Sequence, residues 1–253
     1  MEMFAIPFMQ KALVISLLIG GILAYLGVFI VLRRVIFIGF AISQISACGF
    51  AFGFLLGFEP MVASLIFVFL GICIFSFQRS ESVVPRESLI GGVYVVSAAL
   101  TVLFIAKSPQ AESHMLNILS GNILAVTNAQ IALMAVAAGA ACLLMGLFYK
   151  KFIFSFFDPE TAKSQKLKVE MWNFIFYALI GVIITISIQT AGILLTFAYM
   201  VLPASGALLI STKMKNIFLI SLGSSLAAAF TGLTLSFVMD LSLIHISEPT
   251  RPY

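Results

Sequence analysis

Long apolar segments follow one another along most of the chain and are separated by short polar breaks. A helix needs about 20 apolar residues to cross a hydrocarbon layer roughly 30 Å thick. The pattern therefore predicts an all-α fold, a polytopic transmembrane helical bundle with about eight spans. The expected spans are Phe8–Leu32, Val35–Phe58, Met61–Phe77, Ser88–Ala106, Asn128–Tyr149, Trp172–Ser187, Ile193–Ile210 and Ile217–Met239.

Two local features interrupt this regular pattern. The segment Met115–Val126 is too short to span a bilayer comfortably, and it is predicted to be an interfacial or re-entrant helix. The residues from Gln189 to Gly192 predict a tight break between the sixth and seventh spans, and Pro203 predicts a kink within the seventh.

Composition limits the class of protein. Hydrophobic residues make up 62% of the chain and charged residues 9%, and the mean hydropathy is +1.16, which excludes a soluble globular domain. Cys48, Cys73 and Cys142 lie in separate apolar segments, so they indicate neither a disulfide framework nor a clustered metal site. The chain contains no Walker A phosphate loop and no His-Glu-x-x-His zinc motif. We therefore expect no enzymatic activity, no cofactor bound by this chain and no nucleic-acid partner.

The basic residues predict an orientation for the bundle. If the loop Lys150–Glu170 is cytoplasmic, the alternation of spans places 11 of the 14 lysines and arginines on the same side. By the positive-inside rule we expect these loops inside the cell, the N-terminus outside, and a multi-pass protein in the inner cell membrane. The residues concerned are Arg33, Arg34, Arg79, Arg86, Lys150, Lys151, Lys163, Lys166, Lys168, Lys213 and Lys215.

The loop Lys150–Glu170 is the longest polar passage of the chain. Within it, Asp158 is a suitable N-cap, Pro159 suits the first helical position, and Glu160 complements the positive end of a helix. We interpret 158–166 as a coupling helix on which a soluble motor docks, with the small Ala162 on the contact face one turn after Asp158. The alternative is an ordinary solvated connector between two spans.

The second apolar segment combines small and polar residues. Gly49, Gly53 and Gly57 recur at four-residue spacing, which places them on one helix face and allows another backbone to approach closely. A polar cluster precedes them, and polar groups within a membrane usually face the bundle interior. These side chains either tie helices together or line a transport pathway. The cluster consists of Ser43, Gln44, Ser46 and Cys48.

The last residues do not continue the apolar pattern. The eleven residues Leu241–Arg251 resemble the translation of an adapter used in preparing sequencing libraries, and residues 241–253 are expected to be an artefact. On this interpretation residues 1–240 form the transmembrane domain. We also expect the natural protein to continue into at least one further span.

Several motifs carry a resemblance to one family. They are Gly27–Pro60 with its Arg33-Arg34 pair, Pro85–Gly91, Ser120–Leu124, Asp158–Ala162, Ala191–Leu195 and Val201–Ala204. In this order and spacing they resemble the zinc/manganese-type permeases of bacterial ABC importers. The resemblance implies a membrane-spanning permease in which a second copy of the chain completes the pathway. It also implies a cytoplasmic ATPase subunit that uses ATP, and an extracytoplasmic binding protein that delivers the substrate.

Departures from the family pattern leave the transported ion open. Metal-transporting members typically carry an Asp and, four residues later, a His in the second helix, whereas this chain has Phe40 and Gln44. A histidine found in the fourth helix of some members aligns with Val95. A phenyl ring offers no metal ligand and a neutral amide is a weak one. The chain thus resembles a subgroup without this pair, with a divalent metal of the zinc, manganese or iron class, or a metal chelate, as cargo.

A further departure is Lys166, which stands where a helix-ending Gly is expected. Two other function classes stay open on the sequence alone. A stand-alone secondary transporter should show buried ionisable groups or paired broken helices. A structural membrane protein would have no need of a polar cluster in a glycine-rich span. Genes for an ATPase and a binding protein beside this one would favour the importer.

Overall fold

The computed structural model describes residues 7–76, 85–107, 121, 123 and 126–238, and within these residues the regular structure is helical. The tail 241–253, predicted to be an adapter artefact, and most of the expected interfacial segment Met115–Val126 lie outside the described residues. The helices are α1 (Pro7–Leu32), α2 (Ile36–Leu56), α3 (Pro60–Ser76), α4 (Arg86–Ala106), α6 (Asn128–Leu147), α7 (Tyr149–Phe157), α8 (Pro159–Ser164), α9 (Val169–Ile210) and α10 (Met214–Val238).

The helix lengths account for the predicted spans. Six helices, α1, α2, α4, α6, α9 and α10, are long and apolar enough to cross a membrane, and α3 is a shorter apolar helix of 17 residues. With 42 residues, α9 is about 63 Å long by helical rise, roughly twice the thickness of a bilayer core. Its backbone leaves the helical region at Gly192, with φ 79° and ψ 169°. The two halves of α9 are therefore the predicted sixth and seventh spans, and the all-α membrane bundle is confirmed.

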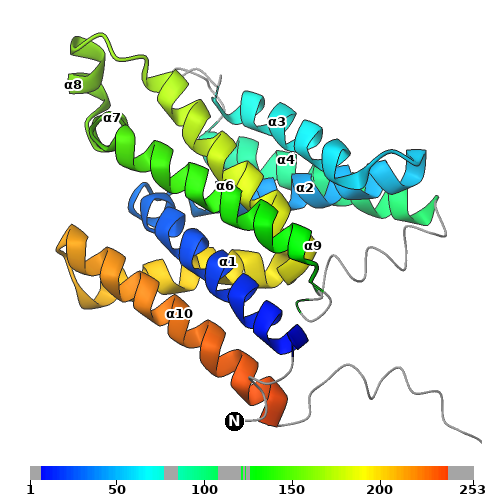
Figure 1. Cartoon of the computed structure of the whole chain (residues 1–253). Coiled ribbons are helices and arrows are strands. Elements are labelled where there is room, and N and C mark those ends of the chain that lie inside the picture. The colour runs from blue at the N-terminus through cyan, green and yellow to red at the C-terminus, as the bar shows by residue number, and fades with distance from the viewer. Residues whose placement is uncertain (1–6, 77–84, 108–120, 122, 124–125, 239–253) are drawn as a thin grey trace, which may run out of the picture.

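Helix α9 lies at the centre of the bundle. It packs against α1 and α10 on one side and against α2 and α3 on the other, and α6 also contacts it. Figure 1 shows α1 and α10 side by side at one edge of the molecule and α2, α3 and α4 grouped at the other. The bend in α9 carries the chain between these two groups, because its halves run in different directions.

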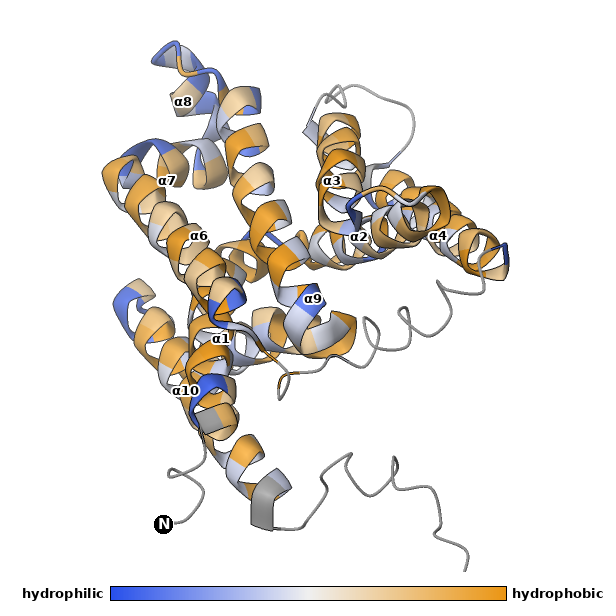
Figure 2. Cartoon of the chain, turned by 45° about the vertical axis from the view of Figure 1, so that its right-hand side comes forward, coloured by the Kyte–Doolittle hydropathy of each residue, from blue (hydrophilic) through white to orange (hydrophobic). Residues whose placement is uncertain are grey.

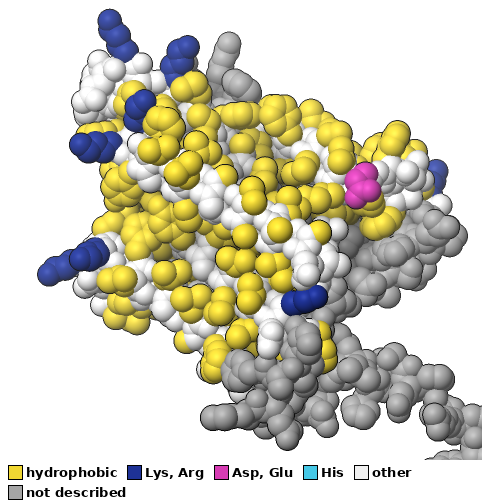
Figure 3. Space-filling model, in the orientation of Figure 1, with side chains coloured by type: hydrophobic (Ala, Val, Ile, Leu, Met, Phe, Trp, Pro, Cys, Tyr) yellow, Lys and Arg dark blue, Asp and Glu magenta, His cyan; other side chains and the backbone are white. Residues whose placement is uncertain are grey.

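Polar residues concentrate at the ends of the helices. Figure 2 shows apolar residues along most of α1, α6 and α9 and hydrophilic residues around α8. In Figure 3, most of the visible lysine and arginine side chains lie at the end of the molecule that carries α7 and α8. This distribution matches the expected gathering of basic residues on one side of the membrane. The cytoplasmic assignment of that side stays a prediction.

Small residues allow close contact between helices. A Cβ atom at Gly49 would collide with the Ser64 backbone of α3, and one at Gly53 would lie 2.7 Å from Pro60 Cα. The expectation for Gly57 needs correction, because nothing lies within 4 Å of a Cβ built there. Gly57 instead ends α2 with φ 70°, a left-handed conformation that glycine adopts without strain. The stripe that packs thus consists of Gly49 and Gly53.

Candidate transport pathway and coupling region

The polar cluster of α2 divides between two faces of the helix. Successive residues of an α-helix are rotated by about 100°, so residues three or four apart share a face. Ser43 and Ser46 are fully buried inside the bundle, whereas Gln44 is only half-buried. The structure therefore does not bring the four predicted pathway residues together on a single surface.

Ser46 belongs to a hydrogen-bonded tie between three helices. Its hydroxyl lies 2.8 Å from that of Ser64 on α3 and donates to Thr185 Oγ1 on α9 at 3.3 Å. Ser64 also donates to the Ser46 carbonyl oxygen at 2.9 Å. Ser43 donates to the Gly39 carbonyl of its own helix at 2.9 Å. These hydroxyls satisfy one another inside the bundle, so this face of α2 holds helices together.

The other face of α2 meets α4. Gln44 Nε2 donates to Thr101 Oγ1 at 3.4 Å, and Thr101 in turn donates to the Ser97 carbonyl at 2.7 Å. The buried Cys48, one turn after Gln44, also interacts with the Thr101 side chain. Gln44 and Cys48 therefore form a polar row between α2 and α4, close to the middle of α2.

Aromatic rings occupy the position one turn before Gln44. The Phe40 ring stacks on Tyr94 of α4, with centroids 4.8 Å apart and an interplanar angle of 20°. It also packs against Phe197 of α9 at 4.9 Å. The family resemblance expects an acidic metal ligand here, and the structure instead places three rings from three helices together. The site therefore offers aromatic rings and no carboxylate oxygen.

The described residues contain no group of three or more His, Cys, Asp or Glu side chains that could hold a metal ion. Val95, aligned with a family histidine, points outward with 62% of its surface exposed. The face formed by Phe40, Gln44, Tyr94 and Phe197 consequently has no strong ligand for zinc or manganese. An ion that crosses here would be held weakly by this chain.

A residue from a distant part of the chain packs closely against the bend in α9. Gly121 has φ 77°, and a Cβ atom there would collide with the Ala191 carbonyl group. Gly192 follows directly, with a backbone conformation that favours glycine. The predicted break between Gln189 and Gly192 is thus confirmed at its last residue. The contact with Gly121 was not predictable from the sequence, because a glycine does not indicate which distant residue it packs against.

The start of α8 follows the prediction from its sequence. Asp158 Oδ1 accepts a hydrogen bond from the Thr161 N–H at 3.0 Å, and Pro159 occupies the first helical position. Hydrogen bonds from Thr161 hold the pKa of Asp158 below its ordinary value, because they favour the carboxylate. Pro159 and Glu160 are exposed at this end of the helix. A negative group here also complements the helix dipole.

The end of α8 explains the unusual Lys166. Lys166 adopts φ 60°, its N–H donates to the Lys163 carbonyl at 2.9 Å, and the Leu167 N–H donates to the Ala162 carbonyl at 2.9 Å. This pair of bonds is a Schellman motif, whose left-handed position is usually glycine. Arg34 closes α1 in the same way, with φ 57°.

The expectation for Ala162 is wrong. Its side chain has no exposed surface, because this face of α8 packs against α7 and α9 within the same chain. The outward face of α8 instead carries Glu160, Lys163 and Ser164. A six-residue helix contains too few turns for its sequence to reveal which face is buried. A bulky residue at position 162 would therefore displace the helix rather than only obstruct a partner.

Arg33 makes contacts that the sequence did not predict. Its guanidinium Cζ lies 4.1 Å from the ring centroid of Phe156 on α7, and Nη2 donates to Asn173 Oδ1 on α9 at 2.9 Å. Phe176 and Tyr177 of α9 lie within 5.8 Å and 5.6 Å. The sequence identified this arginine as a basic residue for orientation and as part of the Arg33-Arg34 pair of the family motif, with no partner for its side chain. The signal that the sequence offers for such a contact is the set of phenylalanines in 152–157, which can receive a cation on their ring faces.

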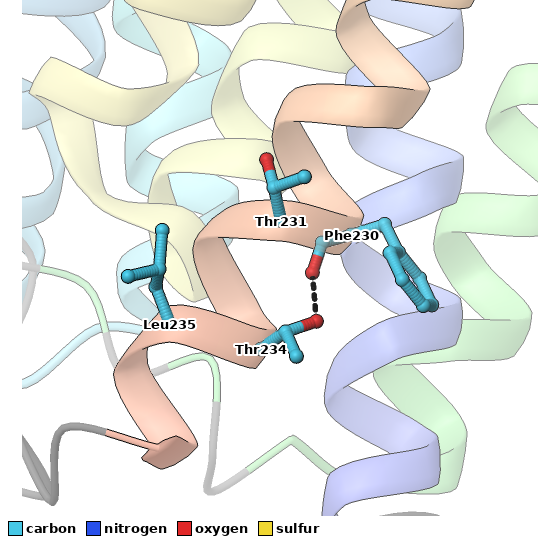
Figure 4. Close-up of a pocket in the computed structure, with 4 residues that line it drawn as sticks. All are labelled: Phe230, Thr231, Thr234 and Leu235. Carbon is cyan, nitrogen blue, oxygen red and sulfur yellow. Dashed lines mark hydrogen bonds between the residues drawn. The ribbon is translucent and has the colours of Figure 1, made fainter.

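Two surface hollows lie away from these residues. Figure 4 shows one on α10, lined by Phe230, Thr231, Thr234 and Leu235. Thr231 and Thr234 donate to the carbonyls of Ala227 and Phe230, so both hydroxyls are used within the helix. The second hollow lies between α6 and α9, and its lining is apolar. Neither presents a set of polar groups directed at a ligand.

Comparisons with known proteins agree with this architecture. The manganese transport system membrane protein MntC of Listeria monocytogenes is 28% identical over 235 residues, covering 93% of this chain and 84% of that protein. A probable iron transport system membrane protein of Haemophilus influenzae is 27% identical over 240 residues, covering 95% and 85%. The structure of PsaBC from Streptococcus pneumoniae in complex with Fab superposes with a TM-score of 0.79 and 27% identity, covering 93% of this chain and 84% of that chain.

The match to a family covers nearly the whole chain. Residues 5–244 match the ABC 3 transport family, and this range includes every helix described above. The resemblance to metal ABC importer permeases inferred from the motifs is thereby confirmed. The chain is a multi-pass membrane protein and belongs to the ABC 3 transport family.

Proposed function

We propose that this chain is the permease subunit of a bacterial ABC importer for a divalent metal, driven by ATP hydrolysis in a separate subunit. The observation that carries the proposal is the family match over residues 5–244, together with relatives named as manganese and iron transport proteins. The polar row and the aromatic rings between α2 and α4 give such a subunit a candidate path.

The side chains along that path limit the forms in which a metal could be transported. Phe40, Tyr94 and Phe197 offer rings where a metal-binding permease would need ionised ligands. The proposed cargo is therefore a metal that stays weakly held on its way through the membrane, or one that travels with a chelator. Both forms fit a path with amide, hydroxyl and aromatic groups.

A second copy of the chain would complete the path. Gln44 lies near the middle of α2 and is half-buried in the single chain, as are Phe40 and Tyr94. An amide exposed to lipid at this depth is costly, and polar side chains within membranes usually face protein or water. A homodimer in which this face lines the path removes that cost. An extracytoplasmic binding protein would supply the cargo from outside.

The ATPase subunit would bind at α8. This helix stands at the end of the molecule where basic residues gather, and its outward face is polar. Its buried face rests on α7 and α9, so a force applied to α8 reaches the spans directly. This arrangement supports the interpretation of the loop as a coupling element, with the N-terminus of the chain outside the cell.

A substitution on the outward face of α8 tests the proposal. We expect the full-length wild-type protein to co-purify with an ATPase subunit and to show manganese-stimulated ATP hydrolysis with the binding protein present. Lys163→Glu should reduce this co-purification at least about tenfold, because it reverses a charge on an exposed docking face. Lys107→Glu, on the opposite expected side of the membrane, is the matched control. Equal co-purification of both variants would refute docking at α8.

The stand-alone secondary transporter is less well supported. In the described spans, Asp, Glu, Lys and Arg residues lie near the helix ends, as Lys11, Glu87 and Glu170 illustrate. Ion-coupled transporters usually place such groups at mid-span. Metal uptake by the purified protein alone, driven by an ion gradient without ATP, would favour that alternative over the importer.

A further inference from the structure

We propose that Arg33 is the positioning residue that transmits movement of α8 to α1 and α9 during transport. This inference rests on the proposed function, because it assigns a role in the coupling of ATP hydrolysis to import. It concerns a site apart from the path between α2 and α4, at the end of α1 that lies beside α7.

Arg33 joins three elements of the chain. From the end of α1, its guanidinium covers the Phe156 ring of α7 at 4.1 Å. The same group reaches α9, where it donates to Asn173 at 2.9 Å and lies 5.6 Å from the Tyr177 ring. The Phe156 and Phe176 rings are themselves in contact, with centroids 4.6 Å apart. A shift of α7 therefore moves the Phe156 ring against the Arg33 guanidinium, and through Arg33 it changes the contact between the end of α1 and α9.

The coupling helix is linked closely to this cluster. Phe156 lies two residues before Asp158, the N-cap of α8. The Asp158 N–H donates to the Phe154 carbonyl at 3.1 Å, which ties the start of α8 to the last turn of α7. A displacement of α8 by a bound ATPase would accordingly pull on the Phe156 ring. The contact between Phe156 and Arg33 is where a displacement of α8 and α7 would be passed to α1.

The backbone around Arg33 is firmly held. The Arg33 N–H donates to the Phe29 carbonyl at 3.1 Å, and the following Schellman motif fixes Arg34 and Val35 against α1. A cation at this position also complements the negative end of the helix dipole. Because the backbone is fixed and the guanidinium is planar, a movement of the Phe156 ring is transmitted through Arg33 to α1. A lysine side chain is flexible and cannot stack on the ring in the same way.

The chemistry of the contact predicts the effect of substitution. A guanidinium over an aromatic face gains both electrostatic attraction and stacking. Lysine in place of Arg33 keeps the positive charge but loses the planar stacking and the fixed geometry, and leucine in place of Phe156 removes the aromatic face altogether. The loss need not prevent assembly, because the Phe29, Phe152 and Phe176 rings continue to pack α1, α7 and α9 together. We expect Arg33→Lys and Phe156→Leu to weaken coupling while the ATPase stays bound.

The test measures manganese uptake per ATP hydrolysed. Full-length protein with the co-purified ATPase and binding protein is reconstituted in liposomes, and both quantities are recorded for each variant. Arg33→Lys and Phe156→Leu should lower the ratio about fivefold or more, with ATPase co-purification unchanged. Arg34→Lys, an exposed neighbour with the same change in chemistry, and Phe156→Tyr, which keeps the ring, should retain the wild-type ratio.

Distinct outcomes separate the two hypotheses. A wild-type protein that binds no ATPase would refute the proposed function and this inference with it. A wild-type protein that imports manganese, with unchanged ratios in Arg33→Lys and Phe156→Leu, would overturn the role of Arg33 alone. So would an equal fall in Arg34→Lys, which would indicate a general effect of replacing an arginine at this end of α1. If Arg33→Lys fails to fold, the uptake per ATP hydrolysed is compared between Phe156→Leu and Phe156→Tyr. Equal values in these two variants would overturn the role of Arg33.

Discussion

The contact between α2 and α3 and the packing of α8 against α7 and α9 both depend on small residues. The first contact is extensive and hydrogen-bonded, whereas the second buries very little of α8. In the first, Gly49 and Gly53 bring α2 and α3 into backbone contact, and Ser46 and Ser64 add hydrogen bonds between them. In the second, a helix of six residues buries little more than Ala162. The first contact lies within the bundle, whereas the second lies at its edge.

This difference separates what maintains the fold from what is free to move. The α2–α3 contact cannot open without exposing hydroxyl groups and voids inside the membrane, which is costly. The ends of α8 are defined instead by a single cap and by Lys166 in a left-handed conformation. An element held in this way can be displaced by a partner at small cost in free energy.

The largest effect is expected in the α2–α3 contact. Gly49→Ala places a methyl group against the Ser64 backbone, so the helices must separate, and overpacking of this kind costs about 1–3 kcal/mol. Thermal unfolding of the detergent-solubilised protein should shift to lower temperature accordingly. Gly139→Ala on α6 is the matched control, because nothing lies within 4 Å of its Cβ position. Equal melting temperatures for the two variants would show that α2 and α3 are not in close contact.

The second experiment restores the ligands that the family pattern expects. Phe40→Asp with Gln44→His places a carboxylate and an imidazole four residues apart on one face of α2. We expect the purified protein to gain zinc or manganese binding, measurable by calorimetry, because both groups are strong ligands. Phe40→Asp alone is the control and should bind more weakly. Tight binding of either ion within the membrane by the wild-type protein would contradict the aromatic path.

The fold was largely predictable from the sequence, because apolar segments of span length report directly on a membrane bundle. The break at Gly192 was predictable for a similar reason, since a glycine after polar residues interrupts a long apolar segment. The faces of α2 were not predictable. Helical rotation separates Gln44 from Ser43 and Ser46. The sequence does not show which of these two faces meets α3 and α9 and which meets α4, because those contacts join residues far apart in the chain.

The coupling region was predictable only in its local chemistry. The cap at Asp158 follows from neighbouring residues and was found, since hydrogen bonds of this kind are local. The burial of Ala162 and the contact of Arg33 with Asn173, 140 residues away, depend on how α7, α8 and α9 pack. Local patterns contain no information about such distant pairs. The composition of 150–170 therefore indicated a docking element without showing which side of it is free.

The smallest effect concerns the left-handed end of α8. Lys166 adopts a conformation that costs a residue with a side chain about 1 kcal/mol relative to glycine. Lys166→Gly should relieve this strain and strengthen the two hydrogen bonds that close the helix, at Lys163 and Ala162. Part of the gain is offset because glycine is more flexible in the unfolded chain. We expect hydrogen exchange in the peptide 158–168 to slow by a few-fold, roughly the factor that such an energy implies.

Two further variants decide whether backbone strain is the cause. Ser164→Gly introduces the same residue within the helix, where glycine is unfavourable, and it should speed exchange in the same peptide. Arg34→Gly relieves the corresponding strain at the end of α1 and should leave exchange in 158–168 unchanged. If Lys166→Gly speeds exchange instead, the lysine side chain holds α8 in place by its own contacts. In that case α8 is held more securely than its short length indicates, and the contrast with the α2–α3 contact would be reduced.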